Sequence, residues 1–197
     1  MTTIGKPKIE KRLKITYMGI RTIAPFKGMS KEIRKIADEL NDWVAVNKIK
    51  TAGPPFLRYH VIDMRGFMDI SYCVPVKKAL PNDGNVKADT IPAGRYASLI
   101  YSGGGISGNR ALIEWVRAQG MDFDRWDTEQ GDNFRGRYET FLTDPKVEPR
   151  KSKWKIEVTI KLADKQKSSQ TSNATCKVLS GTQKSISSCS SLDPIYI

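Results

Sequence analysis

The sequence predicts a single α+β domain made of two similar β-α-β-β units, at about residues 7–78 and 86–163. Two observations predict this fold class. The order strand, helix, strand, strand occurs once in each half of the chain, and the strands alternate apolar and polar side chains, so a helix must cover one face of each unit. Two copies of a unit indicate a pair related by a pseudo-twofold axis rather than a solenoid.

The first unit begins with residues 14–22, which alternate as a strand. Ser30 is the predicted N-cap of a helix that has one apolar face. That face consists of Ile33, Ile36, Ala37, Leu40, Trp43 and Val44. A Gly-Pro-Pro turn at residues 53–55 ends this segment, and residues 56–63 and 69–76 are the two remaining strands.

The second unit begins with a strand at residues 96–101, followed by a glycine turn at residues 103–105. Ser107 or Asn109 is the predicted helix cap, and Gly120 is the predicted helix stop. The apolar stripe of this helix consists of Ala111, Leu112, Trp115 and Val116. The two closing strands are residues 137–142 and 154–162.

The alternation also assigns the two faces of the strands. In strand 154–162 the apolar side chains share one face, which must lie under a helix, and Glu157 is on the other. In strand 69–76 the apolar side chains again share one face, and Ser71 and Cys73 are opposite. Because the faces away from the helices are partly polar, we expect them to line a central ligand cleft on the pseudo-twofold axis.

Composition excludes several classes of function. The net charge of +12 comes from dispersed lysines and arginines without a helix-turn-helix pattern, so we expect surface solvation rather than a nucleic-acid partner. His60 is the only histidine and no Cys-x-x-Cys pair occurs, so we expect no metal and no cofactor, and a Ser-His-Asp triad only if His60 is its base. With no membrane-length apolar run and no secretory signal, we expect a cytoplasmic protein.

The C-terminal segment, residues 164–197, has a different composition. It is rich in serine and poor in large apolar side chains, and such a segment cannot offset the entropy of ordering itself. We therefore predict a disordered tail. Cys176 and Cys189 lie in this tail and are predicted to be free thiols.

Four segments carry a resemblance to a known family. They are Gly53-x-Pro55-Phe56-x-x-Tyr59-His60, Asp69-Ile70…Val74-Pro75-Val76, Ile91-Pro92-Ala93-Gly94-x-Tyr96-Ala97 and Tyr138-Glu139-x-Phe141-Leu142-x-Asp144-Pro145. In this order and spacing, over residues 7–162, the chain resembles the GyrI-like (gyrase-inhibitor-like) small-molecule-binding domains, which also occur as effector-binding domains of multidrug-sensing and AraC-type regulators. It departs from them at residues 103–106, Gly-Gly-Gly-Ile, where many members have a Gly-Pro-Tyr turn, and at Ser71, where members often have an acid.

The resemblance implies a duplicated β-α-β-β fold with a central cleft. Regulator members of the family bind lipophilic, often cationic drugs between aromatic rings and one buried glutamate. Some stand-alone members hydrolyse cyclopropane-bearing genotoxins, and one group inhibits DNA gyrase. The family glutamate lies in a strand motif that Tyr138-Glu139-x-Phe141 matches, so the resemblance assigns its role to Glu139.

The candidate site residues follow from these two lines of reasoning. Glu139 shares a strand face with Arg137 and Phe141, and it is either a cleft carboxylate or a surface acid paired with Arg137. Glu157 is either a second cleft acid or an exposed strand residue. The aromatic candidates for a cleft wall are Tyr59, Tyr101, Phe56 and Trp126, with Trp115 expected in the core and Tyr59 able to pack under a helix instead.

The expected function is that of a stand-alone GyrI-like domain that binds a lipophilic, possibly cationic small molecule, as in a xenobiotic response. Two alternatives stay open. The first is a hydrolase of electrophilic, cyclopropane-bearing xenobiotics with Glu139 as the catalytic residue. The second is a protein inhibitor whose partner is DNA gyrase.

Overall fold

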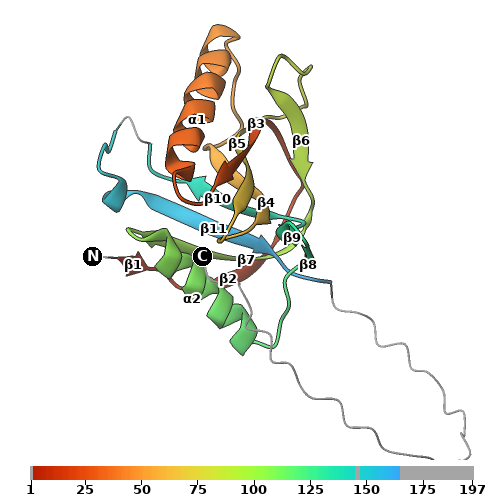
Figure 1. The fold of residues 1–197 in the computed structure, drawn as a ribbon, viewed down its shortest axis with the longest axis vertical. Helices are drawn as coiled ribbons and strands as arrows, with labels where there is room; N and C mark the ends of the chain where they lie inside the picture. The colour runs from red at the N-terminus through yellow and green to blue at the C-terminus, as the bar shows by residue number, and fades with distance from the viewer. Residues whose placement is uncertain (1, 145–146, 165–197) are drawn as a thin grey trace, which may run out of the picture.

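The computed structural model describes residues 2–144 and 147–164 (Figure 1). Within them the chain forms two α-helices and an 11-stranded antiparallel sheet. The helices are α1 (Met29–Val46) and α2 (Gly105–Ala118). The strands are β1 (Thr3–Ile4), β2 (Lys8–Arg12), β3 (Ile15–Pro25), β4 (Phe56–Ile62), β5 (Phe67–Pro75), β6 (Lys87–Ile91), β7 (Gly94–Ser102), β8 (Arg125–Thr128), β9 (Gly131–Phe134), β10 (Arg137–Phe141) and β11 (Lys155–Lys161).

The α+β class is confirmed, and the six strands and two helices that the sequence predicts are present as β3, β4, β5, β7, β10 and β11 and as α1 and α2. A short 3-10 helix, η1 (Lys151–Lys153), precedes β11. Apart from Asp164, the predicted tail with Cys176 and Cys189 lies outside the described residues. In the described part of the chain, neither helix is long and apolar enough to cross a membrane.

The strand order is β1-β7-β11-β10-β4-β5-β3-β6, and every pairing is antiparallel. β10 pairs with β4, so the strands of the first half and those of the second half belong to one continuous sheet. β2 adds to β7, and the β8–β9 hairpin adds to the end of β4. Figure 1 shows α1 over the half that contains β3 and β5, and α2 over the half that contains β7.

Both helices cover the same face of the sheet. Their buried side chains share one core cluster with the strand residues that the alternation assigned to this face, including Ile70, Tyr72, Val74, Val158 and Ile160. The opposite face is more aromatic than the sequence suggests. A second buried cluster there consists of Tyr17, Phe56, Cys73, Ile91, Tyr96 and Tyr138. The guanidinium groups of Arg12 and Arg58 lie 5.9 Å and 5.7 Å from the Tyr138 and Tyr17 ring centroids and help to cover this cluster.

The two predicted helix caps are wrong. Helix α1 begins one residue before Ser30, after Gly28 in a left-handed conformation (φ 99°), and no side chain caps it. Helix α2 begins at Gly105, so Ser107 and Asn109 both lie inside it. The early start is possible because Gly108 lets the helix approach Tyr101: a Cβ at this position would lie 2.4 Å from the tyrosine ring. The predicted stop at Gly120 has the positive φ (63°) expected of a C-terminal glycine.

Candidate functional site

Glu139 lies in the middle of β10 on the helix-covered face, and its side chain is buried, with 8% of the residue exposed. The carboxylate accepts three hydrogen bonds. The hydroxyl of Tyr59 donates to Oε2 at 2.9 Å, and the hydroxyl of Tyr101 donates to Oε1 at 2.9 Å. Asn109 Nδ2 also donates to Oε1, at 2.6 Å. A buried carboxylate held by neutral donors is the centre of this site.

The sheet register explains why these groups meet. Glu139 is paired with Leu57 on β4 and with Val158 on β11, and directly paired residues share a face. Tyr59 is two residues beyond Leu57 along β4 and therefore points to the same side. Tyr101 reaches the carboxylate from β7, one strand beyond β11, and Asn109 reaches it from α2 above the sheet.

Arg137 is the second charged group of this cluster, with 3% of the residue exposed. It donates to Asn109 Oδ1 at 2.9 Å, so the Asn109 amide joins the guanidinium to the Glu139 carboxylate. The guanidinium also lies 4.8 Å from the Phe134 ring centroid and 5.7 Å from that of Tyr59. Burial lowers the pKa of Arg137 and the neighbouring Tyr59 and Glu139 raise it, but an arginine stays charged at neutral pH.

The two tyrosines are fixed as hydrogen-bond donors. Burial raises the pKa of both hydroxyls, and the charge of Glu139 raises it further, so both stay protonated at neutral pH. Burial fixes their rings as well, since 8% of Tyr59 and 2% of Tyr101 is exposed. They therefore present aromatic surface and a polar tip to the same carboxylate.

The first turn of α2 closes the site from above. Gly105 and Gly108 lie directly against Tyr101, and Asn109 follows them toward Glu139. No side chain caps this helix, and its first turns contain two glycines, which have low helix propensity. The element that covers Glu139 therefore has little local stabilisation of its own.

Phe141 lies on the same face of β10 as Glu139, two residues along the strand. Its ring contacts Tyr72 (centroids 6.3 Å apart) and Trp154 (6.1 Å). It lines a cavity of about 700 Å³ beside α1, which includes Asp38, Asn41, Tyr72 and Asp144. Glu139 is not in the lining of this cavity.

Glu157 and Phe56 lie on the opposite face of the sheet. Both are paired with Thr140, whose neighbour Glu139 points the other way. Glu157 accepts a hydrogen bond from Arg12 at 2.7 Å, and Phe56 belongs to the second aromatic cluster. The structure therefore separates the two candidate acids and does not bring them into one cleft.

Two other sequence-predicted residues lie away from Glu139. Trp126 is on β8 and 43% exposed, with the Arg135 guanidinium 5.1 Å from its ring centroid. His60 Nε2 is 2.8 Å from the hydroxyl of Ser71, which is buried. Burial, followed by the charges of Arg58 and Arg21, lowers the pKa of His60 to about 4, so the imidazole is neutral at pH 7.

Sequence reasoning does not find the roles of two residues in the site. It gives Asn109 only as one of two possible helix caps, with Ser107, because an asparagine just before an apolar helical stripe is typical of an N-cap. It considers Arg137 only as a possible surface partner of Glu139, because a buried charge is not visible in a strand pattern. The one available signal is that Arg137, Glu139 and Phe141 share a face of β10.

Comparison with known proteins identifies the family and the fold. The profile of the GyrI-like small molecule binding domain family matches residues 5–163. Among curated protein sequences, none matches the chain. Among solved structures, the EcmrR C-terminal domain has a TM-score of 0.57 at 19% identity, covering 81% of this chain and 98% of that domain.

Two further structures show the same fold. EcmrR in its complex with DNA has a TM-score of 0.57 at 20% identity over 80% of this chain, which spans 57% of the EcmrR chain. A hydrolase from Listeria innocua has a TM-score of 0.54 at 11% identity, with 80% of this chain and 92% of the hydrolase covered.

Proposed function

This chain belongs to the GyrI-like small molecule binding domain family, and from that premise we propose that it binds a lipophilic cation at Glu139. The observation that carries the proposal is a carboxylate that is 8% exposed, hydrogen-bonded by neutral donors and flanked by the rings of Tyr59 and Tyr101. A bulky cation without hydrogen-bond donors can use such a site. It pairs with the carboxylate electrostatically and stacks on the rings, while the hydrogen bonds from the Tyr59 and Tyr101 hydroxyls persist.

We further propose that the binding cleft lies over the seam between β10 and β4, between two duplicated β-α-β-β units. The strand order supports the duplication, because β7-β11-β10 on one side of the seam mirrors β3-β5-β4 on the other. Each of these triplets carries one helix. The cleft would lie on the helix-covered face, and not on the opposite face where we first expected it, because Glu139 points toward α2.

The cavity beside Phe141 is the proposed entrance. Residues two apart on a strand face are roughly 7 Å apart, so a ligand in the cavity at Phe141 is one side chain away from Glu139. To reach the carboxylate, the ligand must displace the first turn of α2. That turn is uncapped and contains Gly105 and Gly108, so its displacement costs little compared with that of a well-capped helix.

Arg137 sets a condition on the ligand. Its charge, linked to Glu139 through Asn109, offsets part of the attraction that the carboxylate exerts on a cation. A small hydrophilic cation would lose its hydration and gain little in return. We therefore propose ligands that combine a delocalised positive charge with a large apolar surface, so that burial of that surface contributes to binding.

Thermal unfolding of the wild-type protein with two matched ligands tests this proposal. Tetraphenylphosphonium is a lipophilic cation, and triphenylphosphine oxide is a neutral compound with similar rings. At ten times its dissociation constant, a ligand adds about 1.4 kcal/mol of stability, which should raise the Tm by about 3 °C or more. The proposal fails if tetraphenylphosphonium at millimolar concentration does not raise the Tm, or if the neutral compound raises it equally.

The hydrolase alternative would use the same carboxylate. Three hydrogen bonds take three of its roughly four lone-pair positions, which leaves one position on Oε2 to accept from a water molecule if Glu139 acts as a general base. Turnover of an electrophilic, cyclopropane-bearing substrate that is lost in a folded Glu139→Gln variant would support the hydrolase alternative. A supercoiling assay with DNA gyrase tests the inhibitor alternative separately from ligand binding and hydrolysis.

A further inference from the structure

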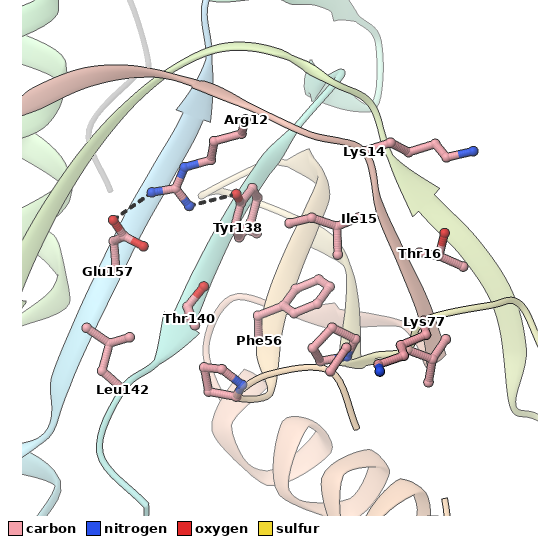
Figure 2. A pocket seen from close by; sticks show the side chains of 14 residues that line it. Arg12, Lys14, Ile15, Thr16, Phe56, Lys77, Tyr138, Thr140, Leu142 and Glu157 are labelled. Atoms are coloured by element: carbon pink, nitrogen blue, oxygen red, sulfur yellow. Dashed lines mark hydrogen bonds and ion pairs between the residues drawn. The ribbon is translucent and has the colours of Figure 1, made fainter. Parts of the chain in front are cut away.

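A second pocket lies on the sheet face opposite Glu139 (Figure 2). Its volume is about 540 Å³, within the range of small-molecule sites. Its lining comes from the β2–β3 connection, the start of β4, the end of β5, and β10 and β11. Across the sheet, Glu157, Thr140 and Phe56 form one row of directly paired residues that crosses this pocket.

The floor of the pocket is apolar and fixed. Phe56 is 2% exposed and Tyr138 is 1% exposed, and their rings meet edge to face with centroids 5.6 Å apart. Tyr17 supports Phe56 from the other side at 5.3 Å. Ile15 and Pro54 extend the apolar lining. A flat hydrocarbon ring placed on this floor would contact side chains that cannot move away.

The acid of this pocket is already neutralised. Glu157 pairs with Arg12 at 2.7 Å and with Lys8 at 3.9 Å, while Glu10 bonds to the same two cations. Two cations and two carboxylates make this group neutral. Arg12 also donates to the Tyr138 hydroxyl at 2.9 Å, which Figure 2 shows beside its bond to Glu157. A cationic ligand would therefore find no free carboxylate here.

The remaining charge of the pocket is positive. Lys14 and Lys77 line its rim, both exposed, and within the described residues neither ammonium group has an ion-pair partner. Figure 2 shows the ammonium group of Lys77 directed toward Phe56, while the side chain of Lys14 extends from the upper edge away from Arg12 and Tyr138. Thr16 and Thr140 add hydroxyl groups to the lining. An apolar floor with two free ammonium groups at the rim matches an amphiphilic anion.

We propose that this pocket is a second binding site, which takes a small aromatic carboxylate. Its ring lies on Phe56 beside Tyr138, and its carboxylate pairs with Lys77, while Lys14 adds positive charge at the rim. This site goes beyond the proposed function because it lies on the other face of the sheet and selects the opposite charge. It gives the domain two ligand sites separated by the thickness of one sheet.

Calorimetric titration with 2-naphthoate at low ionic strength tests this site. 2-Naphthoate should bind, and the neutral 2-naphthylmethanol and the cationic 2-naphthylmethylammonium should bind at least about fivefold more weakly, because only the acid gains from the lysines. Its affinity should fall as NaCl is added. Tetraphenylphosphonium should not displace it. Failure of 2-naphthoate to bind at 5 mM, or its displacement by tetraphenylphosphonium, would overturn the proposal.

Two variants locate the bound acid. Lys77→Gln should weaken 2-naphthoate binding about fivefold, whereas Lys78→Gln, which removes the same charge from an exposed neighbour outside the pocket, should leave it unchanged. Thr140→Trp fills the space above Phe56 and should abolish binding in a protein that keeps its wild-type Tm and circular dichroism. Equal effects of the two lysine variants, or full binding by a folded Thr140→Trp protein, would contradict this site.

Discussion

Replacing Glu139 by glutamine removes the charge at the centre of the proposed site with little change of shape. The amide oxygen of the glutamine can accept from Tyr101 and Asn109, and its nitrogen can donate to Tyr59 if that hydroxyl turns to accept. The fold should therefore persist. For a cation about 5 Å from the carboxylate, at an effective dielectric constant of about 20, the lost attraction is about 3 kcal/mol. Because Arg137 offsets part of it, we expect about 2 kcal/mol, or about 30-fold weaker binding.

Isothermal titration with tetraphenylphosphonium measures this loss. The control is Glu114→Gln, which changes the net charge equally on the exposed side of α2 and should leave the affinity unchanged. The neutral triphenylphosphine oxide, bound weakly, should lose little affinity in either variant. If a folded Glu139→Gln protein binds tetraphenylphosphonium as tightly as the wild type, then the carboxylate is not the counter-ion and the reasoning is refuted.

Three further predictions concern stability. Gly108→Ala should destabilise the protein by about 1–2 kcal/mol, because its Cβ would meet the Tyr101 ring at 2.4 Å. This loss outweighs the gain of up to ~1 kcal/mol that alanine brings through its higher helix propensity. Thermal unfolding beside the exposed Ser107→Ala control measures the change, and a stabilised Gly108→Ala protein would contradict the packing. Asn109→Ala should cost about 2–4 kcal/mol in urea unfolding, since Glu139 and Arg137 each lose a hydrogen bond, and a cost below about 0.5 kcal/mol would show that the amide does not join them. The pKa of His60 is about 4 in the fold and about 6.5 in the unfolded chain. The neutral imidazole therefore contributes fully to the free energy of unfolding above pH 6.5. This contribution is lost as the pH falls toward 4, by up to about 3 kcal/mol. Burial and Asp127 raise the pKa of Asp132 to about 6, so protonation of Asp132 stabilises the fold over the same pH range. The test is therefore the difference in free energy of unfolding between the wild type and His60→Gln. Parallel curves of this free energy from pH 7 to pH 4 would refute the prediction.

The elements that the sequence predicted are those that bury an apolar face. The helix residues Ile36 and Leu40, and strand residues such as Ile70 and Val158, repeat at the period of their element and are buried in one core. Strands β2 and β6 were missed because they bury almost nothing. β2 has a charged sequence and is mostly exposed, and β6 has one fully buried residue, Ile91. They form because longer strands offer them backbone partners, which a periodicity pattern does not record.

The candidate site was predicted in part. Glu139 was singled out through the family resemblance, and Tyr59 and Tyr101 were named as aromatic candidates. That both donate to this carboxylate depends on the register of β10 with β4 and β11, which the sequence leaves open. Asn109 could not be placed, because its role depends on how closely α2 approaches the sheet at Gly108.

The charged residues on the face opposite Glu139 also make contacts that the sequence does not reveal. Arg12 and Glu157 are far apart in sequence and pair only because β2 and β11 both lie beside β7. Pairing through a third strand leaves no local signal. For this reason the sequence allowed Glu139 and Glu157 to share one cleft, whereas the structure places them on opposite faces of the sheet.

The most direct measurement is a crystal structure of the protein grown with tetraphenylarsonium, whose arsenic atom is located by its anomalous signal. We predict a peak within about 6 Å of the Glu139 carboxylate on the helix-covered face, with the first turn of α2 displaced from Tyr101. An arsenic peak in the pocket beside Glu157, or only on the outer surface with Glu139 still closed under α2, would contradict the account.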